Sequence, residues 1–554
     1  MKAYYNLLSN ELVLISSTKI TTLNLNNEDM EIIDPDNYLR IECEKPKNNL
    51  IKVNGEKVYV QFFTLKVPKL KKSKKPIKKN ISGLKLIKIF NNPYISKYKL
   101  KGKNFNIGII DGGAVFKHYE FSNGNRVKYT QNKITDDHAT HVAGTFAAYG
   151  YNLNAKGVAI EANIYSYYFG NYLNSLKSLA SKNINSVNNS YGYVEGWDYG
   201  NYYYGVTYEY YIENYQKGPI YSYSFGKYLT ETREIDSIAN QYKNFVMCFA
   251  AGNDGTDGYN FGNWYIQNQN GNWITMDPTK YPPPLNDNQQ DNIGTLACAK
   301  NIITVGATND FGLTPTDFSS SGPTDDLRIK PDIMANGDYV FSTINRGYKS
   351  YGTMSGTSMA CPFATGSCLL IQQFIQEQLK YFPVSATIKA CLIHGAINKT
   401  INGKYGYGLI NMINTLKFLE DVLLNKSYLY NDILSDNEIK YTFNSPTLTV
   451  TLCWNDIAGQ PSSDEPEKND KSIVNQLGLY VENNGKYYYP YRLETKNGNA
   501  VQKKSDNFDS SLLVNYDNVQ KIMIENLNGI SNIYVKSIKF SNSQTFSLCI
   551  SPSF

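Results

Sequence analysis

The chain has 554 residues, of which 42% are hydrophobic and 19% are charged. This length and composition predict a soluble globular protein of two or three domains, and no apolar run approaches the ~18 residues of a membrane span, so no membrane partner is expected. The net charge of +6 arises in one tract, because seven lysines between positions 69 and 79 leave the rest of the chain at −1.

Residues 1–67 alternate short apolar runs, such as Leu12–Ile15 and Lys57–Phe63, with Asn-rich turns. This alternation predicts a small mainly-β unit. The first eleven residues interrupt their apolar positions with polar ones, so we expect no signal peptide.

A Lys-rich tract follows at 68–83. Blocks of like charge bind nucleic acid or anionic surfaces in some proteins, but this one has few aromatics to stack on bases and contains Pro68 and Pro76. We interpret it as a solvated linker between domains and expect no nucleic-acid partner.

The eight cysteines are scattered, with neither metal-type spacing nor the pattern of a small disulfide framework. Reduced, buried thiols are therefore expected. Together with the absent signal peptide, they favour an intracellular or virion-associated location over classical secretion.

Between 84 and 420, strand-like and helical runs alternate, which predicts an α/β domain with a parallel sheet flanked by helices. The strand-like runs are Phe105–Ile110, Ala162–Tyr167, Phe245–Ala250 and Ile302–Val305, and the helical ones are His138–Ala148, Asn174–Lys182, Ile235–Tyr242 and Ser358–Gln378.

The first of these strands ends in Asp111, followed by two glycines. This places a carboxylate at the carboxyl end of a strand, where α/β sheets keep their sites. The next segment, Asp136–Thr145, carries His138 and His141, two of the chain's four histidines.

The segment Gly352–Ser358 is small and polar, and the sequence turns apolar from Met359. This predicts a tight loop entering a buried helix, with Pro362 in the first turn and free N–H groups giving Ser358 a positive local field. The alternative is that Ser358 only caps a core helix.

A serine hydroxyl stays protonated near neutral pH, so it attacks an amide only with help from a base whose pKa is near 7. That base in turn needs a carboxylate to fix its tautomer. Asp111, His138 and Ser358 supply these three parts.

These three segments, in this order, resemble the subtilase family of serine peptidases, and the match over Gly356–Ala360 is highly specific. The resemblance implies a subtilisin-like endopeptidase acting on polypeptides, with His141 structural and with no cofactor needed for the chemistry. It implies structural calcium by family only, with no metal ligands identified. It also implies that residues 1–67 are a prosegment or accessory unit.

The same resemblance assigns further site residues. Asn253 completes the oxyanion hole beside the Ser358 N–H. The specificity pocket has one wall formed by Ser190, Tyr191 and Gly192 and another formed by Ala250, Ala251 and Gly252.

The sequence departs from the family pattern at four places, none of which removes a catalytic group. Gly112 replaces a hydroxyl residue after the aspartate, Ala139 replaces a glycine, Asn336 replaces a proline, and Cys361 replaces Thr or Ser. Cys361 is interpreted either as a conservative change or as a redox-sensitive thiol.

Two long insertions lie near the pocket segments. One, between Gly192 and Asn253, is rich in tyrosine; it forms a rim of the substrate cleft or only reflects a composition with 47 tyrosines. The other, Tyr259–Asp291, is long enough to be a lid or a disordered loop.

After a connector at 421–440, residues 441–554 show short alternating runs and an Asn483-Asn484-Gly485 turn. This pattern predicts an antiparallel β-sandwich, similar to the jelly-roll-like domain of large alkaline subtilases.

Two hypotheses follow. The chain is a serine endopeptidase, or it is a catalytically weak or inactive protein that uses the same fold for binding or assembly. The oligomeric state is left open.

Overall fold

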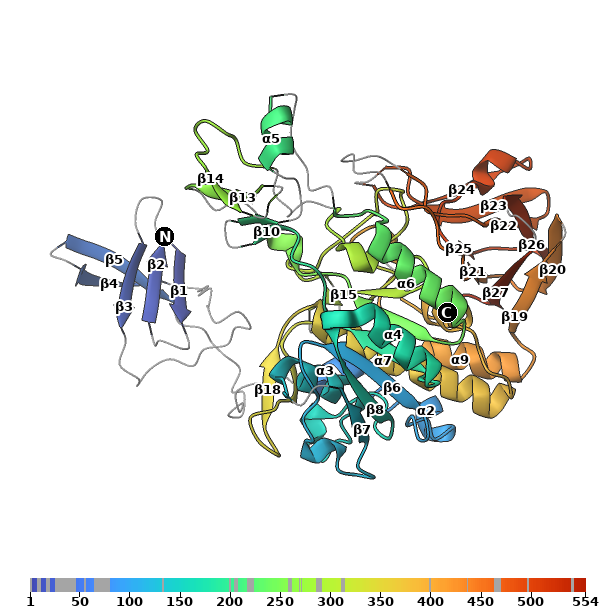
Figure 1. Ribbon diagram of the computed structural model, residues 1–554, viewed down its shortest axis with the longest axis horizontal. Helices are drawn as coiled ribbons and strands as arrows, with labels where there is room; N and C mark the ends of the chain where they lie inside the picture. Colours follow the sequence, from blue (N-terminus) through green and yellow to red (C-terminus); the bar gives the residue numbers. More distant parts are fainter. Residues whose placement is uncertain are drawn as a thin grey trace. The chain divides into compact units, whose positions relative to one another are not determined.

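The computed structural model describes residues 80–554, apart from 132–133, 199–200, 204–207, 217–223, 258–261, 269, 271, 285–290, 310–313, 398–399, 436, 463–469, 496–497 and 540–542. It also describes the backbone of five strands between 2 and 63. The chain forms two compact units, residues 1–77 and 78–554 (Figure 1). The predicted Lys-rich linker falls mostly outside the described residues.

The first unit contains two antiparallel sheets. One has the order β1 (Lys2–Asn6), β2 (Glu11–Ile15), β3 (Ile20–Asn24), and the other pairs β4 (Pro46–Val53) with β5 (Glu56–Phe63). The prediction of a mainly-β N-terminal segment is confirmed.

A parallel sheet of seven strands forms the centre of the second unit. Its order is β16 (Ile333–Asn336), β15 (Ile303–Thr308), β12 (Val246–Ala250), β9 (Ser186–Asn189), β6 (Asn106–Asp111), β8 (Asn163–Tyr168), β7 (Val127–Thr130). The predicted α/β class is confirmed.

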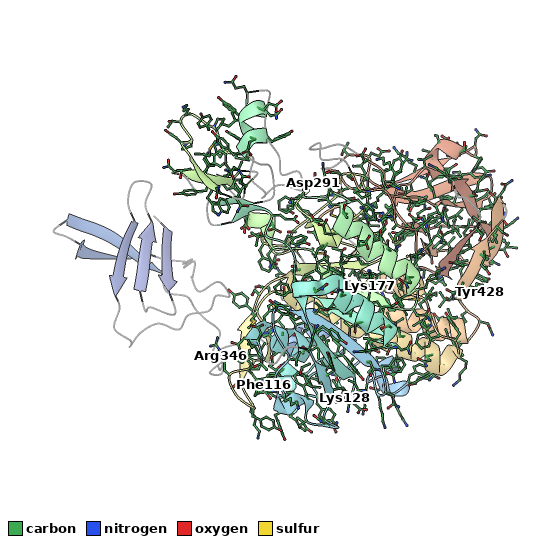
Figure 2. All side chains as sticks on the ribbon, viewed as in Figure 1. Phe116, Lys128, Lys177, Asp291, Arg346 and Tyr428 are labelled. Atoms are coloured by element: carbon green, nitrogen blue, oxygen red, sulfur yellow. The ribbon has the colours of Figure 1, made fainter. Side chains whose placement is uncertain are left out.

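Successive side chains of these strands enter different cores, because a strand alternates its faces. From β12 and the residue before it, Val246, Cys248 and Ala250 join the core that includes α3 (Asp137–Ala147) and α7 (Thr357–Phe374), whereas Phe245, Met247 and Phe249 join the core of α4 (Tyr172–Ser181) and α6 (Thr230–Gln241). Helices therefore cover both faces, and side chains fill the layers between (Figure 2).

The remaining helices are α1 (Asn80–Leu86), α2 (Pro93–Lys97), α5 (Tyr208–Asn214), α8 (Ser385–His394) and α9 (Met412–Leu423). The hairpin β17 (Val340–Thr343) and β18 (Tyr351–Met354) leads into α7.

Helix α7 is buried along its whole length except at Ser358. It begins at Thr357, so the prediction that Pro362 lies in the first turn is wrong, since Pro362 is the sixth helical residue. A proline there cannot donate to the carbonyl four residues earlier, which is that of Ser358. Ser190 Oγ donates to this carbonyl instead, at 2.9 Å.

The two insertions fold together. Strands β10 (Gly196–Asp198), β11 (Asn201–Tyr203), β13 (Trp264–Gln267) and β14 (Trp273–Met276) form one sheet, which projects with α5 from the central sheet (Figure 1). Trp197, Tyr211 and Trp264 form its buried core. These aromatic residues therefore serve local packing, and the second insertion contains strands of its own.

The C-terminal region packs a four-stranded sheet against a five-stranded one, around a shared apolar core. The first has the order β19 (Tyr428–Leu434), β27 (Gln544–Ser551), β21 (Leu448–Cys453), β25 (Val519–Ile524), and the second β20 (Glu438–Asn444), β26 (Ile530–Lys539), β22 (Gln476–Asn483), β23 (Lys486–Arg492), β24 (Val501–Ser505). All pairs are antiparallel, as predicted, and β22 turns into β23 at Asn484-Gly485.

Buried charges join this region to the central sheet. Lys300 Nζ lies 2.9 Å from Asp456 Oδ2 and donates to the Ser472 carbonyl at 2.6 Å, and both side chains of the ion pair are fully buried. Helix α8 packs on β21 and β27. The two regions therefore share one interior. In the described part of the chain, no helix is both long and apolar enough to cross a membrane.

Candidate active site

Three neighbouring strands of the sheet end at one edge, and each supplies a predicted site residue. Asp111 is the last residue of β6, Ser190 follows β9, and Asn253 lies three residues beyond β12. Because parallel strands end together, residues distant in sequence meet there.

His138 and Ser358 reach this edge from helix N-termini. Each is the second residue of its helix, and α3 packs against α7. Ser358 caps nothing, since the N-cap of α7 is Gly356, so the capping alternative is wrong. The φ of Gly356 is +150°, a conformation that L side chains rarely adopt.

His138 and Asp111 form a close pair. His138 Nδ1 lies 2.9 Å from Asp111 Oδ1 and 3.0 Å from Oδ2. Asp111 is buried, whereas the His138 side chain is 34% exposed. Burial lowers the pKa of His138, but the hydrogen bond and charge of Asp111, with the charge of Asp136, outweigh it and raise this pKa above its usual value. This arrangement favours the imidazolium and leaves Nε2 for a reacting group.

Two of the departures from the family pattern lie beside this pair. The Gly112 N–H donates to Asp111 Oδ1 at 2.8 Å, so the backbone holds the carboxylate in the absence of the usual hydroxyl. The Ala139 N–H donates to Asp136 Oδ2 at 2.9 Å, and Asp136 thereby caps α3. Neither change displaces the pair.

The Ser358 hydroxyl donates to the Ser190 carbonyl at 3.2 Å. Among the described residues, no hydrogen bond joins it to His138. The hydrogen bond between Ser358 and His138 that proton transfer requires is therefore not formed in this structure. Catalytic hydrogen bonds are often long until substrate binds. The prediction that Ser358 and His138 act together stays a prediction.

Asn253 is exposed, and its amide is fixed from one side. Its Oδ1 accepts hydrogen bonds from Thr357 N at 2.9 Å and Thr357 Oγ1 at 3.0 Å. Asn253 Nδ2 and Oδ1 lie 3.5 and 3.7 Å from the point where a Cβ of Gly356 would stand, and Ser358 N lies 3.7 Å from the same point. The Asn253 amide and the Ser358 N–H are therefore both near Gly356.

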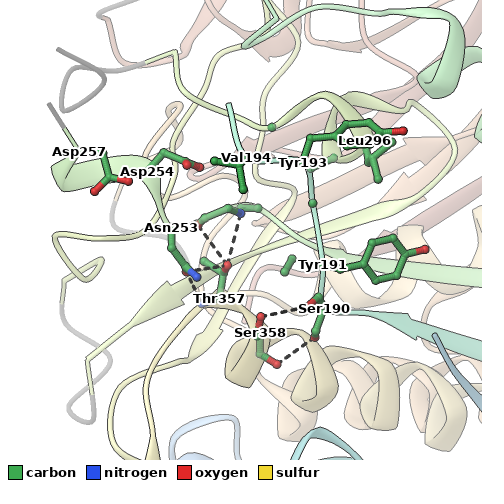
Figure 3. Close-up of a pocket in the computed structure, with 16 residues that line it drawn as sticks. Ser190, Tyr191, Tyr193, Val194, Asn253, Asp254, Asp257, Leu296, Thr357 and Ser358 are labelled. Carbon is green, nitrogen blue, oxygen red and sulfur yellow. Dashed lines mark hydrogen bonds between the residues drawn. The ribbon is translucent and has the colours of Figure 1, made fainter. Parts of the chain in front are cut away.

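A pocket of about 390 Å³ opens beside Ser358 (Figure 3). Its lining includes all the predicted wall residues, which are Ser190, Tyr191, Gly192, Ala250, Ala251 and Gly252. Hydrogen bonds fix one wall, because Asn188 Nδ2 donates to Ser190 Oγ at 2.9 Å and Tyr191 OH donates to Asn189 Oδ1 at 3.1 Å.

Asn253 and Ser358, both predicted site residues, also belong to the lining. The other lining residues were not predicted from the sequence, and they are Tyr193, Val194, Asp254, Asp257, Gly294, Leu296, Ala297 and Thr357. Gly294 and its neighbours follow the second insertion and match none of the motifs. Their only sequence signal is that they lie within ten residues of the start of β15 at Ile303.

His141 is buried, with Nε2 2.8 Å from the Val340 carbonyl, which agrees with the predicted structural role. Burial lowers its pKa from 6.5 to about 4. The folded-state pKa lies below the unfolded one, so the stability that this neutral histidine contributes is complete above pH 6.5 and is lost as the pH falls toward 4.

In His141→Gln, the glutamine keeps a donor near Nε2 but does not titrate. Between pH 6.5 and 4, we therefore expect the free energy of unfolding of this variant to fall by ~3 kcal/mol less than that of the wild type. Urea unfolding of both proteins at a series of pH values measures this difference. Parallel pH profiles for the two proteins would contradict the assignment.

Cys361 lies in α7 with its Sγ 4.0 Å from the Asn189 carbonyl, and burial raises the pKa of its thiol well above the usual value. The thiolate is the reactive form, so this position favours the conservative interpretation over the redox-sensitive one. All seven cysteines in the described part are buried and free of disulfides.

The described residues contain one cluster with metal-ligand spacing, formed by Asp111, Asp136 and His138. His138 Nδ1 and the Asp111 carboxylate already bind each other, and calcium prefers oxygen ligands. This cluster does not fit the calcium that the family resemblance implies.

The family model of the subtilase family matches residues 102–408, which span the whole central sheet. A serine protease/ABC transporter B family protein, tagB, of Dictyostelium discoideum is 25% identical over 408 residues, covering 57% of this chain and 20% of that protein. The major intracellular serine protease of Bacillus subtilis is 26% identical over 308 residues, covering 53% of this chain and 76% of that protein.

Among solved structures, the prenylagaramide maturation protease PagA is 16% identical with a TM-score of 0.41, covering 60% of this chain and 98% of that one. The present chain thus spans one fifth of the length of the Dictyostelium relative and about three quarters of the Bacillus one. Because the family model covers more than half of the sequence, the chain belongs to the subtilase family.

Proposed function

We propose that this protein is a serine endopeptidase that hydrolyses peptide bonds through an acyl-enzyme. The carrying observation is the buried Asp111 paired at 2.9 Å with His138, at the sheet edge where Ser358 is the one residue of α7 that is not buried. A structural serine would not need this exposure.

In this mechanism Ser358 Oγ attacks the scissile carbonyl while His138 Nε2 accepts its proton. Asp111 holds the imidazole in the required tautomer and stabilises the imidazolium. Asn253 Nδ2 and the Ser358 N–H donate to the oxyanion of the tetrahedral intermediate. The imidazolium then protonates the departing amine, and water, deprotonated by His138, releases the acyl group from Ser358.

Fluorophosphonate labelling tests the proposal, because these reagents form a covalent bond only with an activated serine. We expect labelling of the wild type and none of Ser358→Ala. Ser355→Ala is the matched control, since Ser355 lies in the same loop but its hydroxyl donates to Asp338 Oδ1 at 3.1 Å. Its labelling should persist.

Labelling that survives Ser358→Ala, or is absent from folded wild type, would overturn the proposal. It would leave the alternative of a weak or inactive subtilase fold used for binding or assembly.

The N-terminal unit is proposed to be a prosegment that is released by self-cleavage. Its attachment through a Lys-rich stretch between Val67 and Leu84 supports this idea, since charged, polar connectors are common sites of proteolysis. Mass spectrometry of the purified protein maps any cut, and an intact stretch in active protein would favour a retained accessory unit.

The proposed substrates are polypeptides in a compartment that keeps thiols reduced. The seven cysteines in the described part of the chain are buried and unpaired, which supports this location, because disulfides are rare where thiols stay reduced.

A further inference from the structure

Gly294, which lines the pocket, leaves a space next to two acceptors. A Cβ added to Gly294 would stand 4.0 Å from the Ala251 carbonyl oxygen and 4.0 Å from Glu195 Oε2, and apart from the two chain neighbours no atom would be nearer. Gly294 has ordinary extended angles, φ −62° and ψ 150°, so its backbone does not require a glycine. The missing side chain leaves room for a substrate group between these oxygens.

Glu195 is a buried carboxyl with 2% of its surface exposed, and it lies behind Gly294, which lines the pocket, and not in the lining itself. Its two oxygens accept long hydrogen bonds of 3.3 and 3.2 Å from one backbone donor, Thr295 N. Burial raises the pKa of Glu195 to about 8. Hydrogen bonds from Thr295 lower this pKa, and the charge of Asp254 raises it further. A cation close by would stabilise the ionised carboxylate.

The lining of the pocket is also acidic. Asp254 and Asp257 line the pocket, and none of the described lining residues is Lys, Arg or His. Figure 3 shows Asp254 between Asp257 and Val194, on the side of the pocket opposite Tyr191. The described lining therefore contributes acidic side chains and no basic ones.

The rest of the lining suits the stem of a long side chain. Ala250, Leu296 and Ala297 contribute apolar side chains to the lining of this pocket, whose volume is about 390 Å³. Lysine and arginine bury an aliphatic stem while placing a charge at its end.

We propose that this pocket selects a lysine or arginine side chain on the residue whose carbonyl Ser358 attacks. The ammonium or guanidinium group binds between Glu195 and the Ala251 carbonyl oxygen, and Asp254 and Asp257 attract it into the pocket. The inference rests on the proposed function and names the substrate class of that site.

The test uses the full-length protein and peptides that differ only at this residue, with lysine, arginine, norleucine or glutamate. Norleucine matches the lysine stem without its charge. We expect kcat/KM for lysine and arginine to exceed that for norleucine by about 10- to 100-fold, because a buried polar site rejects a substrate that leaves it unpaired.

Glu195→Gln removes the charge at nearly constant shape and is expected to bring the lysine-to-norleucine ratio close to one. Glu231→Gln is the matched control, because Glu231 is half-buried in the first turn of α6 and is not among the atoms next to Gly294. It should keep the wild-type ratio. If Glu195→Gln does not fold, Gly294→Ala is used to test the same lysine-to-norleucine ratio. The added methyl group has 4.0 Å of clearance and fills the space that the cationic group would occupy.

Equal cleavage of the norleucine and lysine peptides by the wild type, or an unchanged ratio in the folded Glu195 or Gly294 variant, would overturn the inference. The same peptides bound to Ser358→Ala in a calorimeter separate it from the proposed function. A preference for lysine there supports the pocket even if no turnover occurs, whereas failed fluorophosphonate labelling counts against catalysis alone.

Discussion

Asp111→Asn is expected to lower kcat for peptide hydrolysis by about 10⁴-fold with little change in fold. The Asp111 carboxylate accepts a hydrogen bond from His138 Nδ1 at 2.9 Å, which leaves Nε2 as the acceptor that Ser358 needs. An amide at position 111 donates as well as accepts, so it stabilises the tautomer in which Nε2 carries the proton and cannot take another.

The pH profile distinguishes this effect from general damage. Asp111 raises the pKa of His138 through its hydrogen bond and its charge. Removing that charge should lower this pKa, so the acidic limb of kcat/KM should shift to lower pH in whatever activity remains. Peptide hydrolysis between pH 4 and 9 measures both quantities.

Asp137→Asn is the matched control. Asp137 is the neighbour of His138, but its carboxylate pairs with Arg346 Nε at 2.7 Å and accepts from Asn345 N at 2.9 Å. We expect wild-type kcat and an unshifted pH profile. An Asp111→Asn protein as active as this control would rule out the proposed role of Asp111.

Asp332→Ala is expected to lower the free energy of unfolding by about 3–5 kcal/mol. Asp332 lies between two buried lysines, with Oδ2 2.6 Å from Lys330 Nζ and Oδ1 2.8 Å from Lys389 Nζ. All three side chains are at most 3% exposed. Removing the carboxylate leaves two lysine ammonium groups in the interior without this counter-ion. The resulting loss of stability is far larger than the stability that the ion pairs provide relative to apolar side chains at the same positions.

Urea unfolding at neutral pH measures the loss as a lower midpoint at constant slope. Glu161→Ala is the control, because the Lys101–Glu161 pair of 3.1 Å is at the surface, with side chains 47% and 20% exposed. Such pairs contribute ~0–1 kcal/mol. A midpoint shift for Asp332→Ala no larger than that of the control would show that solvent reaches the cluster.

Several features of the fold and site are local enough for sequence patterns to predict. Asp111 ends an apolar run, and the two-residue turn Asn484-Gly485 has positive φ at both positions, which asparagine and glycine tolerate best. The start of α7 follows from small residues giving way to apolar ones. Each of these depends on neighbours within a few residues.

Helix limits were less accurate where tertiary contacts decide them. Helix α6 begins at Thr230, five residues before the predicted start, and α7 passes into a π-helical turn at Ile375–Leu379. The polar first turn of α6 lacks the apolar periodicity on which the prediction relied, yet Thr232 is buried there and donates to the Thr295 carbonyl at 2.8 Å.

By itself, the sequence determined the α/β class and the antiparallel C-terminal sheets, and it predicted the acid, base and serine of the candidate site and the two pocket walls, because these follow from short-range patterns and specific motifs. Only the tertiary structure placed Glu195 beside Thr295 and Gly294, about a hundred positions away, and Lys300 beside Asp456. The physical reason is that Glu195 and Asp456 are buried next to residues that are far away in the sequence. No local sequence pattern specifies which distant residue will be buried beside them.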